Sequence, residues 1–509
     1  MRKLNNSRKI IKSESLSDFS EKLRVQGKSI GMCHGVFDLL HPGHFAHFKA
    51  AKSSVDVLFV SVTADRFVNK GPGRPLFTDE VRAQTISALE YVDYVFISDN
   101  PTAVQSIELI KPNVYFKGSD YINIEDDVTG MIAVEISHVK KYGGEVVFTN
   151  EITSSSSKLI NGFFSSHSDD VNRWLSDFRN RFTVQDLNKY LDLVENTCVG
   201  VIGEIIIDKY TNCEPLAKSS KDPILAFQMN DTSTYLGGVL AIRDNINSWA
   251  KSVSLFTSLP EKVREDQISL IQEISNIEHL NAVHTESSLI IKHRYVDMGS
   301  QARVFETYDF NQRELGRKEE VLYQMIKESN STSDLWIVAD YGHGLISKSM
   351  ARKIASVDNF LAVNTQANAG NRGYNTITKF PRADFLSLNG GELQLELRER
   401  NLNYENIVPQ YMKKMNATYA VLTLGARGMM VFSTNNHVLI PALGNRVVDK
   451  VGAGDSVLAI GSILARHSAP IEIIGIISSI VAAHEIGQLG HRTSLRISDI
   501  KKAVKGLMG

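Results

Sequence analysis

The chain has 509 residues, more than one hydrophobic core usually serves, so two or three domains are expected. Its 56 basic and 57 acidic residues nearly cancel, which argues against nucleic acid or an anionic membrane as a partner. The three cysteines form no Cys-x-x-Cys pair, and the longest apolar run, 471–483, contains Glu472 and is too short to span a bilayer. No signal-peptide core follows the basic opening residues, so we expect a cytoplasmic protein.

The first third of the chain alternates short β-like runs with helical ones. Residues 1–27 are a polar lead-in with one amphipathic helix at about 16–23, and the alternation occupies residues 28–162. This pattern is typical of a parallel sheet with helices on both faces. The expected strands are 55–62, 92–97, 114–116 and 145–148, and the expected helices are 79–89, 101–110 and 132–142.

Residues 163–197 are charged and predict a helical linker, and a second α/β alternation occupies residues 198–509. Two β-branched runs inside it, 288–291 and 302–308, suggest an antiparallel insertion beside the sheet. The other expected strands are 199–203, 335–339, 361–364, 385–388 and 421–424, and apolar helices are expected at 457–465 and 471–483.

The stretch from Cys33 to His44 passes from an apolar run through a polar corner into a helix. Pro42 and Gly43 separate His41 from His44 at a strand end and a helix start, where open sheets favour anions. Nucleotidyl transfer to a phosphate needs charge stabilisation more than a base, because the attacking oxygen is already ionised. Hydrogen bonds from His41 and His44 suit that task. The alternative is a solvated histidine cluster or a metal site.

Gly35-Val36-Phe37-Asp38 followed by His41-Pro42-Gly43-His44 resembles the signature of the cytidylyltransferase-like nucleotidyltransferases. The similarity covers about residues 28–162. It is strongest to the adenylyltransferase half of the bifunctional heptose-phosphate kinase/adenylyltransferases of lipopolysaccharide core synthesis. It implies a Rossmann-like domain in which His41 and His44 bind the triphosphate. Cys33-His34 stands where that family usually has Thr-Asn. The resemblance further implies nucleotide or phosphate contacts for Gly35, Phe37, Lys52, Arg82, Lys117, Ser154, Ser155 and Ser156, although Lys52 and Arg82 can equally be ordinary helix charges.

A second glycine-bearing corner, Gly452-Ala453-Gly454-Asp455, leads into the apolar helix at 457–465. Three backbone N–H groups with little side-chain bulk make a nest for a phosphoryl group in transit. A sugar hydroxyl must lose a proton as it attacks, so Asp455 is the expected general base. The alternative is that Asp455 only complements the helix dipole.

The wider pattern over about residues 198–500 resembles the ribokinase-like (PfkB) sugar kinases, again with similarity to the heptose-phosphate kinases. Its landmarks are Gly203-Glu204, Asp208, Gly237-Gly238, Asp340-Tyr341-Gly342, Asn389, Glu392, Gly425, Gly428 and residues 449–455. The resemblance implies a ribokinase-like α/β domain with a small β-lid, Asp455 as the base and Gly452, Ala453 and Gly454 as the anion hole. It implies further that Asp208, Gly237, Gly238 and Asp449 lie on the substrate side, that Gly425 and Gly428 lie on the nucleotide side, and that Asn389 and Glu392 lie near Mg²⁺, which has no direct protein cage.

Two positions on the sugar side depart from this family. Ala241 stands where an asparagine usually holds the sugar, and Glu204 replaces the aspartate of the usual Gly-Asp pair. Loss of a polar contact leaves a substrate hydroxyl unpaired, so either the substrate differs or this half binds weakly. For Asp208, a role as a sugar-hydroxyl ligand and a role as an ordinary surface charge fit the sequence equally well.

The two resemblances together imply a bifunctional enzyme whose domain order is the reverse of the heptose enzyme's. The kinase half would phosphorylate a sugar or sugar phosphate with ATP and Mg²⁺, and the other half would join the sugar 1-phosphate to a nucleotide, supplied by ATP or by CTP. Such a product would feed a surface polysaccharide. One alternative is a cytidylyltransferase and kinase for a polyol or glycerol-type phosphate, and another is a nucleotide-binding scaffold with an inactive kinase half. The lid-like run at 302–308 resembles the element through which related kinases form homodimers.

Overall fold

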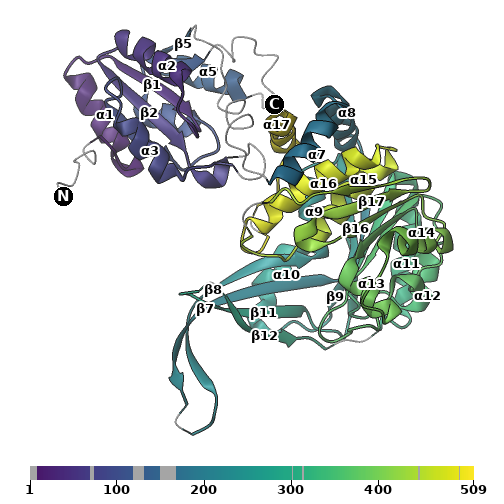
Figure 1. The fold of residues 1–509 in the computed structure, drawn as a ribbon. Helices are drawn as coiled ribbons and strands as arrows, with labels where there is room; N and C mark the ends of the chain where they lie inside the picture. Colours follow the sequence, from purple (N-terminus) through teal and green to yellow (C-terminus); the bar gives the residue numbers. More distant parts are fainter. Residues whose placement is uncertain are drawn as a thin grey trace. The chain divides into compact units, whose positions relative to one another are not determined.

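The computed structural model describes residues 9–68, 74–118, 131–149, 168–219, 221–300, 302–311, 314–444, 447–491 and 493–508. The chain divides into two compact units, one of Met1–Leu175 with Ser498–Gly509 and one of Ser176–Ile497 (Figure 1). The expected linker contains two helices, α7 (Asp169–Arg179) and α8 (Val184–Glu195). Ser154, Ser155 and Ser156 lie outside the described residues.

The first unit is built on a parallel sheet in the order β3-β2-β1-β4-β5. β1 pairs with β2 on one side and with β4 on the other, so the strand order reverses between β1 and β4. The carboxyl ends of strands at such a switch point are where open α/β sheets bind ligands. The strands are β1 (Ile30–Gly35), β2 (Val57–Thr63), β3 (Tyr94–Ser98), β4 (Val114–Gly118) and β5 (Glu145–Thr149).

Helices cover both faces of this sheet, because its strands are apolar on both sides. Cys33 faces a core that includes Phe48 and Ile86, and Met32 faces a second core that includes Leu16 and Ile107. The amphipathic helix expected in the lead-in is therefore part of the domain. The helices are α1 (Leu16–Val25), α2 (Pro42–Ser53), α3 (Asp79–Ser87), α4 (Val104–Ile110) and α5 (Met131–Lys141).

The second unit contains a nine-stranded sheet in the order β10-β9-β6-β13-β14-β15-β16-β17-β18. The strands from β10 to β16 are parallel, and β17 and β18 close one edge in antiparallel pairing. The strands are β6 (Cys198–Gly203), β9 (Ser252–Pro260), β10 (Leu280–Thr285), β13 (Leu335–Asp340), β14 (Phe360–Thr365), β15 (Phe385–Asn389), β16 (Tyr419–Thr423), β17 (Met429–Ser433) and β18 (His437–Ile440).

A separate four-stranded sheet, which we call the lid, has the order β12-β11-β7-β8. The expected antiparallel insertion corresponds to β11 (Ile290–Asp297) and β12 (Arg303–Asp309). β7 (Ile205–Lys218) and β8 (Leu225–Gly238) form a long hairpin that projects from the unit (Figure 1) and has no counterpart among the expected elements.

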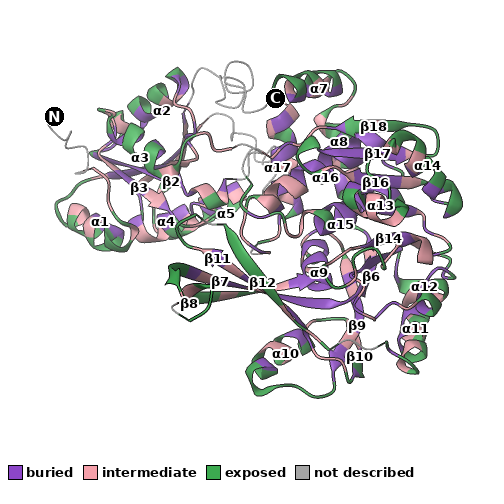
Figure 2. Cartoon of the chain, turned by 60° about the horizontal axis from the view of Figure 1, so that its bottom comes forward, coloured by how far each residue is buried: buried purple, intermediate pink, exposed green. Residues whose placement is uncertain are grey.

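The helices nearest the second corner are deeply buried. α15 (Ala453–Arg466) and α16 (Ile471–Ile486) pack against each other and are largely buried, whereas β12 and the outer part of β8 are exposed (Figure 2). Within the described ranges, every helix is too short or too polar to cross a membrane. The remaining helices are α9 (Val239–Asn247), α10 (Ile268–Ser275), α11 (Lys318–Glu328), α12 (Lys348–Ile354), α13 (Gly390–Leu397), α14 (Tyr404–Lys414) and α17 (Ile497–Met508).

Candidate active sites

The histidine corner lies at the carboxyl end of β1, at the start of α2. His41 is the extended residue that precedes the helix, and Pro42 occupies the first helical position, where its missing N–H costs nothing. The His41 and His44 rings lie 3.9 Å apart between centroids, and the Phe37 ring meets His44 edge-on at 5.4 Å. Three of the predicted residues therefore meet at one helix start, where the helix dipole favours an anion.

A buried ion pair between Asp38 and Arg74 fixes the loop between β1 and α2. The Asp38 carboxylate accepts hydrogen bonds from Arg74 at 2.7 Å and from the Leu76 N–H at 2.7 Å. A side chain at Gly35 would press on the Phe37 ring, which lies 3.0 Å from the position of its Cβ. The position of Phe37, which has a left-handed backbone (φ 50), is thus fixed by its neighbours.

Arg82 lies in the interior of this unit and uses its guanidinium as a brace. It donates to the carbonyl of Val36 and to the carbonyl of Thr63 at 2.8 Å, and it forms an ion pair with Asp65 at 2.6 Å. A further hydrogen bond reaches the Phe77 carbonyl. Arg82 therefore ties the ends of β1 and β2 together, and its contact with phosphate stays a prediction.

The structure does not bring Lys52 to the histidine corner. Lys52 lies ten residues beyond Pro42 on α2, a rise of about 15 Å along a helix. Its ammonium forms an ion pair with Asp93 at 2.6 Å and donates to the carbonyl of Asp56. Both partners precede strands, so Lys52 lies at the amino edge of the sheet, opposite the edge where phosphate contact was expected.

Lys117, on β4, forms a buried ion pair with Glu135 of α5 at 2.8 Å. Burial opposes the charge of Glu135, but the Lys117 ammonium, the His34 imidazole and the Ala103 N–H together hold the pKa of Glu135 below its usual value. His34 lies nearby on β1 and contacts the Ser61 hydroxyl at 3.0 Å. Burial, reinforced by Lys117, lowers the pKa of His34 to about 4, so this imidazole is neutral.

The second corner places Asp455 in the first turn of α15, where it is buried. Burial raises the pKa of Asp455 to about 7, the Tyr341 hydroxyl and the Lys292 ammonium favour its carboxylate, and the Glu485 and Asp208 charges oppose it. A carboxyl group with a pKa near neutrality can take up a proton at the pH of the cell. Asp455 is therefore not a surface helix acid, and its role as a general base stays a prediction.

The glycines before Asp455 leave the helix start open. Gly452 precedes α15 with a left-handed backbone (φ 86), which glycine adopts without strain. A Cβ on Gly454 would meet nothing within 4 Å, whereas one on Gly452 would lie 3.0 Å from the Glu485 carboxylate. The first N–H groups of a helix have no acceptor within it, so this open turn has the form of an anion nest.

On the sugar side, Asp208 of the lid strand β7 is buried and forms an ion pair with Arg294 of β11. Gly237 lies directly beside it, because any Cβ at that position would clash with the Asp208 carboxylate. Lys292 pairs with Asp208 in register across the lid and acts on the charge of Asp455 as well. The structure thus brings Asp208, Gly237 and Asp455 to one region, and Asp208 is not a surface charge.

Asp449 and Glu204 serve the scaffold of this region. Asp449 accepts a hydrogen bond from the Tyr210 hydroxyl at 2.6 Å and forms an ion pair with Arg303, so it joins two lid strands to the loop before α15. Glu204 accepts backbone hydrogen bonds from Tyr341 at 3.0 Å, His343 at 2.9 Å and Leu345 at 3.3 Å. Glu204 therefore braces the turn after β13. Burial, with the nearby Asp340 charge, raises the pKa of Glu204 above its usual value.

Ala241 is buried in the first turns of α9, which starts directly after Gly238. One helical turn further on, the buried Asn245 donates to the Ser456 hydroxyl at 3.4 Å. Asn245 thus places an amide on the same face of α9 as Ala241, but this amide contacts Ser456, the residue after the candidate base Asp455.

On the nucleotide side, Asn389 caps α13 by accepting a hydrogen bond from the Gly391 N–H at 2.9 Å, and its amide reaches Thr423 at 3.1 Å. Gly425 and Gly428 follow on the neighbouring strand end with left-handed backbones. Glu392 accepts a hydrogen bond from the Ala367 N–H at 3.0 Å. The strand ends of β15 and β16 thus hold all four predicted residues.

Two family models match the chain in separate regions. The cytidylyltransferase-like model matches residues 32–161, and the pfkB family carbohydrate kinase model matches residues 350–496. The chain therefore joins an N-terminal cytidylyltransferase-like domain to a C-terminal pfkB domain. With the two sheets described above, these matches confirm the expected fold class, a Rossmann-like domain followed by a ribokinase-like one.

Curated relatives match the cytidylyltransferase-like domain. "Bifunctional protein HldE" of Methylobacillus flagellatus is 37% identical over 154 residues, which is 30% of each protein. The protein of the same name from Gluconobacter oxydans is 36% identical over 162 residues, 31% of this chain and 32% of that protein. The chain thus spans about a third of the length of the curated relatives that it matches.

Among solved structures, phosphofructokinase-2 from Escherichia coli in complex with potassium covers 61% of this chain and 99% of its own, at 12% identity and a TM-score of 0.49. Ribokinase from Thermotoga maritima covers the same shares at 14% identity and a TM-score of 0.48.

The side chains of the pfkB domain fit a magnesium nucleotide. Burial raises the pKa of Glu392 to about 7, and a divalent cation beside such a carboxyl group favours its charged form. Among the described residues, no group of three or more His, Cys, Asp or Glu side chains is arranged to hold a metal ion. The expectation that Mg²⁺ binds with the phosphates of the nucleotide, with Glu392 close by, stays a prediction.

Three residues of the pfkB site were not predicted from the sequence. Lys292 and Arg294 lie two residues apart on β11, on the face that meets Asp208. The side-chain amide of Gln366 donates to the Asp455 carboxylate at 2.7 Å. Basic residues two apart in a β-like run were the available signal for the first two. Gln366 had only its place two residues after an expected strand.

Proposed function

We propose that the pfkB domain transfers the γ-phosphoryl group of ATP to a hydroxyl of a sugar or sugar phosphate. The observation that carries this proposal is the placement of buried Asp455 between an open glycine turn and the Asp208 region. The acceptor hydroxyl gives its proton to Asp455 as its oxygen attacks the γ-phosphorus, and the bond to the bridging oxygen breaks to leave ADP.

The residues of this domain divide the work. The N–H groups at the start of α15 stabilise charge on the phosphoryl group in transit, and Asp208 orients the acceptor from the lid. Bound Mg²⁺ would neutralise charge on the ATP phosphates. Because the pKa of Asp455 lies at about 7, the carboxylate is present at neutral pH and is basic enough to accept a proton.

The cytidylyltransferase-like domain would use the product of the kinase. A sugar 1-phosphate oxygen attacks the α-phosphorus of a nucleoside triphosphate, and pyrophosphate leaves. His41 and His44, at the start of α2, stabilise the charge that builds up on the triphosphate. No general base is needed, because the attacking oxygen carries its charge already.

The sugar is heptose-like in this proposal. The product is a nucleotide-activated sugar, made in the cytoplasm, that serves the synthesis of a surface polysaccharide. The HldE names of the relatives and the resemblance to heptose-phosphate kinase/adenylyltransferases support it. Dimerisation through the lid belongs to the same proposal. Ala241, where related kinases place a sugar-binding asparagine, is the observation that favours a rival, a scaffold whose kinase half has lost turnover.

The test supplies purified full-length protein with ATP, Mg²⁺ and a panel of sugars, sugar phosphates and polyol phosphates, and measures ADP. Sugar 1-phosphates are then offered with ATP or CTP, and pyrophosphate release is measured. We expect acceptor-dependent ADP formation and a preference for one nucleotide. ATP binding without ADP formation from any acceptor would establish the scaffold instead, and pyrophosphate release with CTP and a polyol phosphate alone would establish the polyol enzyme.

A further inference from the structure

Gln366 contacts the candidate base although 89 residues separate them in the sequence. It is the first residue after β14, and its side-chain amide donates to the Asp455 carboxylate at 2.7 Å. Its backbone N–H donates to the carbonyl of Asp340 at the end of the adjacent strand β13, at 2.9 Å. Both ends of Gln366 are therefore fixed, one to the sheet edge and one to Asp455.

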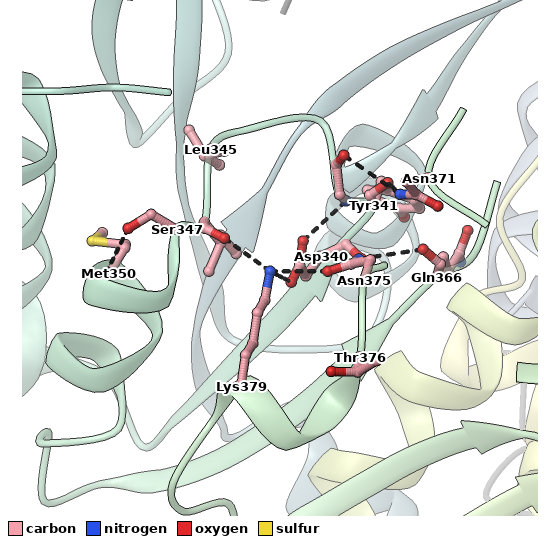
Figure 3. A network of polar contacts seen from close by, with 12 residues as sticks. Asp340, Tyr341, Leu345, Ser347, Met350, Gln366, Asn371, Asn375, Thr376 and Lys379 are labelled. Carbon is pink, nitrogen blue, oxygen red and sulfur yellow. Dashed lines mark hydrogen bonds and ion pairs between the residues drawn. The ribbon is translucent and has the colours of Figure 1, made fainter. Parts of the chain in front are cut away.

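The segment that follows Gln366 is joined to the turn after β13 by asparagine amides (Figure 3). Asn368 and Asn371 donate to the carbonyl of Tyr341 at 2.8 and 2.9 Å, and Asn375 donates to the carbonyl of Asp340 at 3.0 Å. Asn375 also reaches the carbonyl of Gln366 at 3.3 Å. These bonds couple the two loops that present Tyr341 and Gln366 to the site.

Lys379 holds the same pair of loops from the other side. It forms an ion pair with buried Asp340, and it donates to the carbonyl of Ile346 at 2.8 Å and to the Asn375 side chain at 3.0 Å (Figure 3). A Cβ on Gly342 would clash with the Asn371 amide, so the turn closes tightly on this network. A side chain supported in this way keeps one orientation at small entropic cost.

We propose that Gln366 is a positioning residue for Asp455. Its amide holds one carboxylate oxygen, so that the other oxygen is directed toward the acceptor hydroxyl. This role rests on the proposed kinase function, in which Asp455 accepts the proton. A glutamine suits it because its amide donates a hydrogen bond to the carboxylate without adding a charge.

The charge of Asp455 is set by groups on several elements. Lys292 on β11, Tyr341 after β13 and Asp208 on β7 face it from the lid side and the sheet, and Glu392 of α13, Glu485 of α16 and His491 act on it from the helical side. A glutamate at position 366 would place a second negative charge against this carboxylate. Two carboxyl groups so close cannot both ionise readily, so the pair would bind a proton more tightly.

The test compares kcat/KM against pH for Gln366→Glu, Gln366→Met and the wild type, measured as ADP formation by the full chain. Gln366→Glu should shift the acid limb, the fall of kcat/KM at low pH, to higher pH by at least about one unit. Gln366→Met keeps the length but removes the donor, and it should lower kcat about tenfold or more while KM changes less. The matched charge control is Gln324→Glu on the exposed face of α11, which should leave the profile unchanged. An acid limb that stays in place in Gln366→Glu overturns the proposal.

A second measurement keeps this test separate from the proposed function. Carbon-13 NMR of labelled aspartate carboxyl groups reports the titration of Asp455 without any acceptor, and Asp455→Asn identifies its signal. The Asp455 midpoint should be higher in Gln366→Met than in the wild type, because a donor to the charged form is lost. Equal midpoints would reject the role of Gln366. Absence of ADP formation in the wild type would reject the kinase function and leave this titration to decide.

Discussion

The two candidate sites share a place in their sheets but differ in how their charges are arranged. In the cytidylyltransferase-like domain the buried charges are paired, as in Lys117 with Glu135 and Arg82 with Asp65. The pfkB domain also has buried ion pairs, such as Asp208 with Arg294, but in addition burial raises the pKa of Asp455 and that of Glu392 to about 7.

This difference matches the needs of the two proposed reactions. A phosphate nucleophile arrives ionised and needs only its charge and that of the triphosphate to be managed. A sugar hydroxyl must be deprotonated, and a carboxyl group with a raised pKa is suited to that step. If both proposed reactions hold, the ionisation state of the nucleophile decides whether each site needs a titratable base.

Asp455→Asn should have the largest effect of the variants considered. The amide keeps the shape but cannot accept the proton, so ADP formation should fall by about 10³-fold or more. Pyrophosphate release from a supplied sugar 1-phosphate should continue at the wild-type rate. Both rates are measured on the same preparation, and equal loss of the two would mean that the variant misfolds or that the two reactions are not separate.

His44→Ala addresses the other domain and should have the opposite pattern. Removal of one hydrogen-bond donor from the triphosphate site should lower pyrophosphate release about 10²-fold to 10³-fold, with ADP formation unchanged. His138→Ala, on α5 away from the helix start, is the matched histidine control. A full rate in His44→Ala would show that this imidazole does not stabilise the reaction.

The pairing of charges in the first domain can be broken with Lys117→Met. Glu135 would then be buried without its cation, at a cost of about 3 to 5 kcal/mol in the free energy of unfolding. Hydrogen exchange of peptides from this domain during urea unfolding of the full chain measures that loss. The double variant Lys117→Met with Glu135→Leu should recover most of it, and a stability like the wild type's in the single variant would contradict the ion pair.

The two proposed activities should differ in their pH dependence. Because the pKa of Asp455 is raised to about 7, lowering the pH below that value protonates the base, and kcat/KM for ADP formation should fall about tenfold per unit. His34 is neutral down to about pH 4, so it adds no such limb to pyrophosphate release. Rates measured between about pH 5 and about pH 8, a range that brackets the Asp455 value and lies above the His34 value, check this. Parallel profiles would contradict it.

The smallest expected effect is that of Lys52→Met. Its ammonium lies at the amino edge of the sheet with Asp93, so pyrophosphate release should change less than about threefold, and stability by no more than about 1 kcal/mol. Arg82→Lys is the contrast, because one ammonium cannot replace four hydrogen bonds, of which those to Val36 and Thr63 hold the ends of β1 and β2. A large rise in the KM for the nucleotide in Lys52→Met would instead support the phosphate contact that the family resemblance implies for Lys52.

Local patterns in the sequence predicted much of the fold. Period-two and helical apolar runs located most strands of both sheets within a few residues, such as β5 at 145–149, and helix signals located α15 and α16. The same reasoning placed His41 before a helix and Asp455 in a first turn, because capping and turn chemistry depend on neighbours in the chain.

Tertiary structure alone decided which distant residues meet. Packing placed Gln366 against Asp455 and gave Lys52 its partner Asp93, and neither contact follows from periodicity. The hairpin β7–β8 likewise carries Asp208 to Arg294 by pairing between segments far apart in the chain. A sequence pattern reports which face of an element is buried, whereas contact between elements depends on how the whole chain packs.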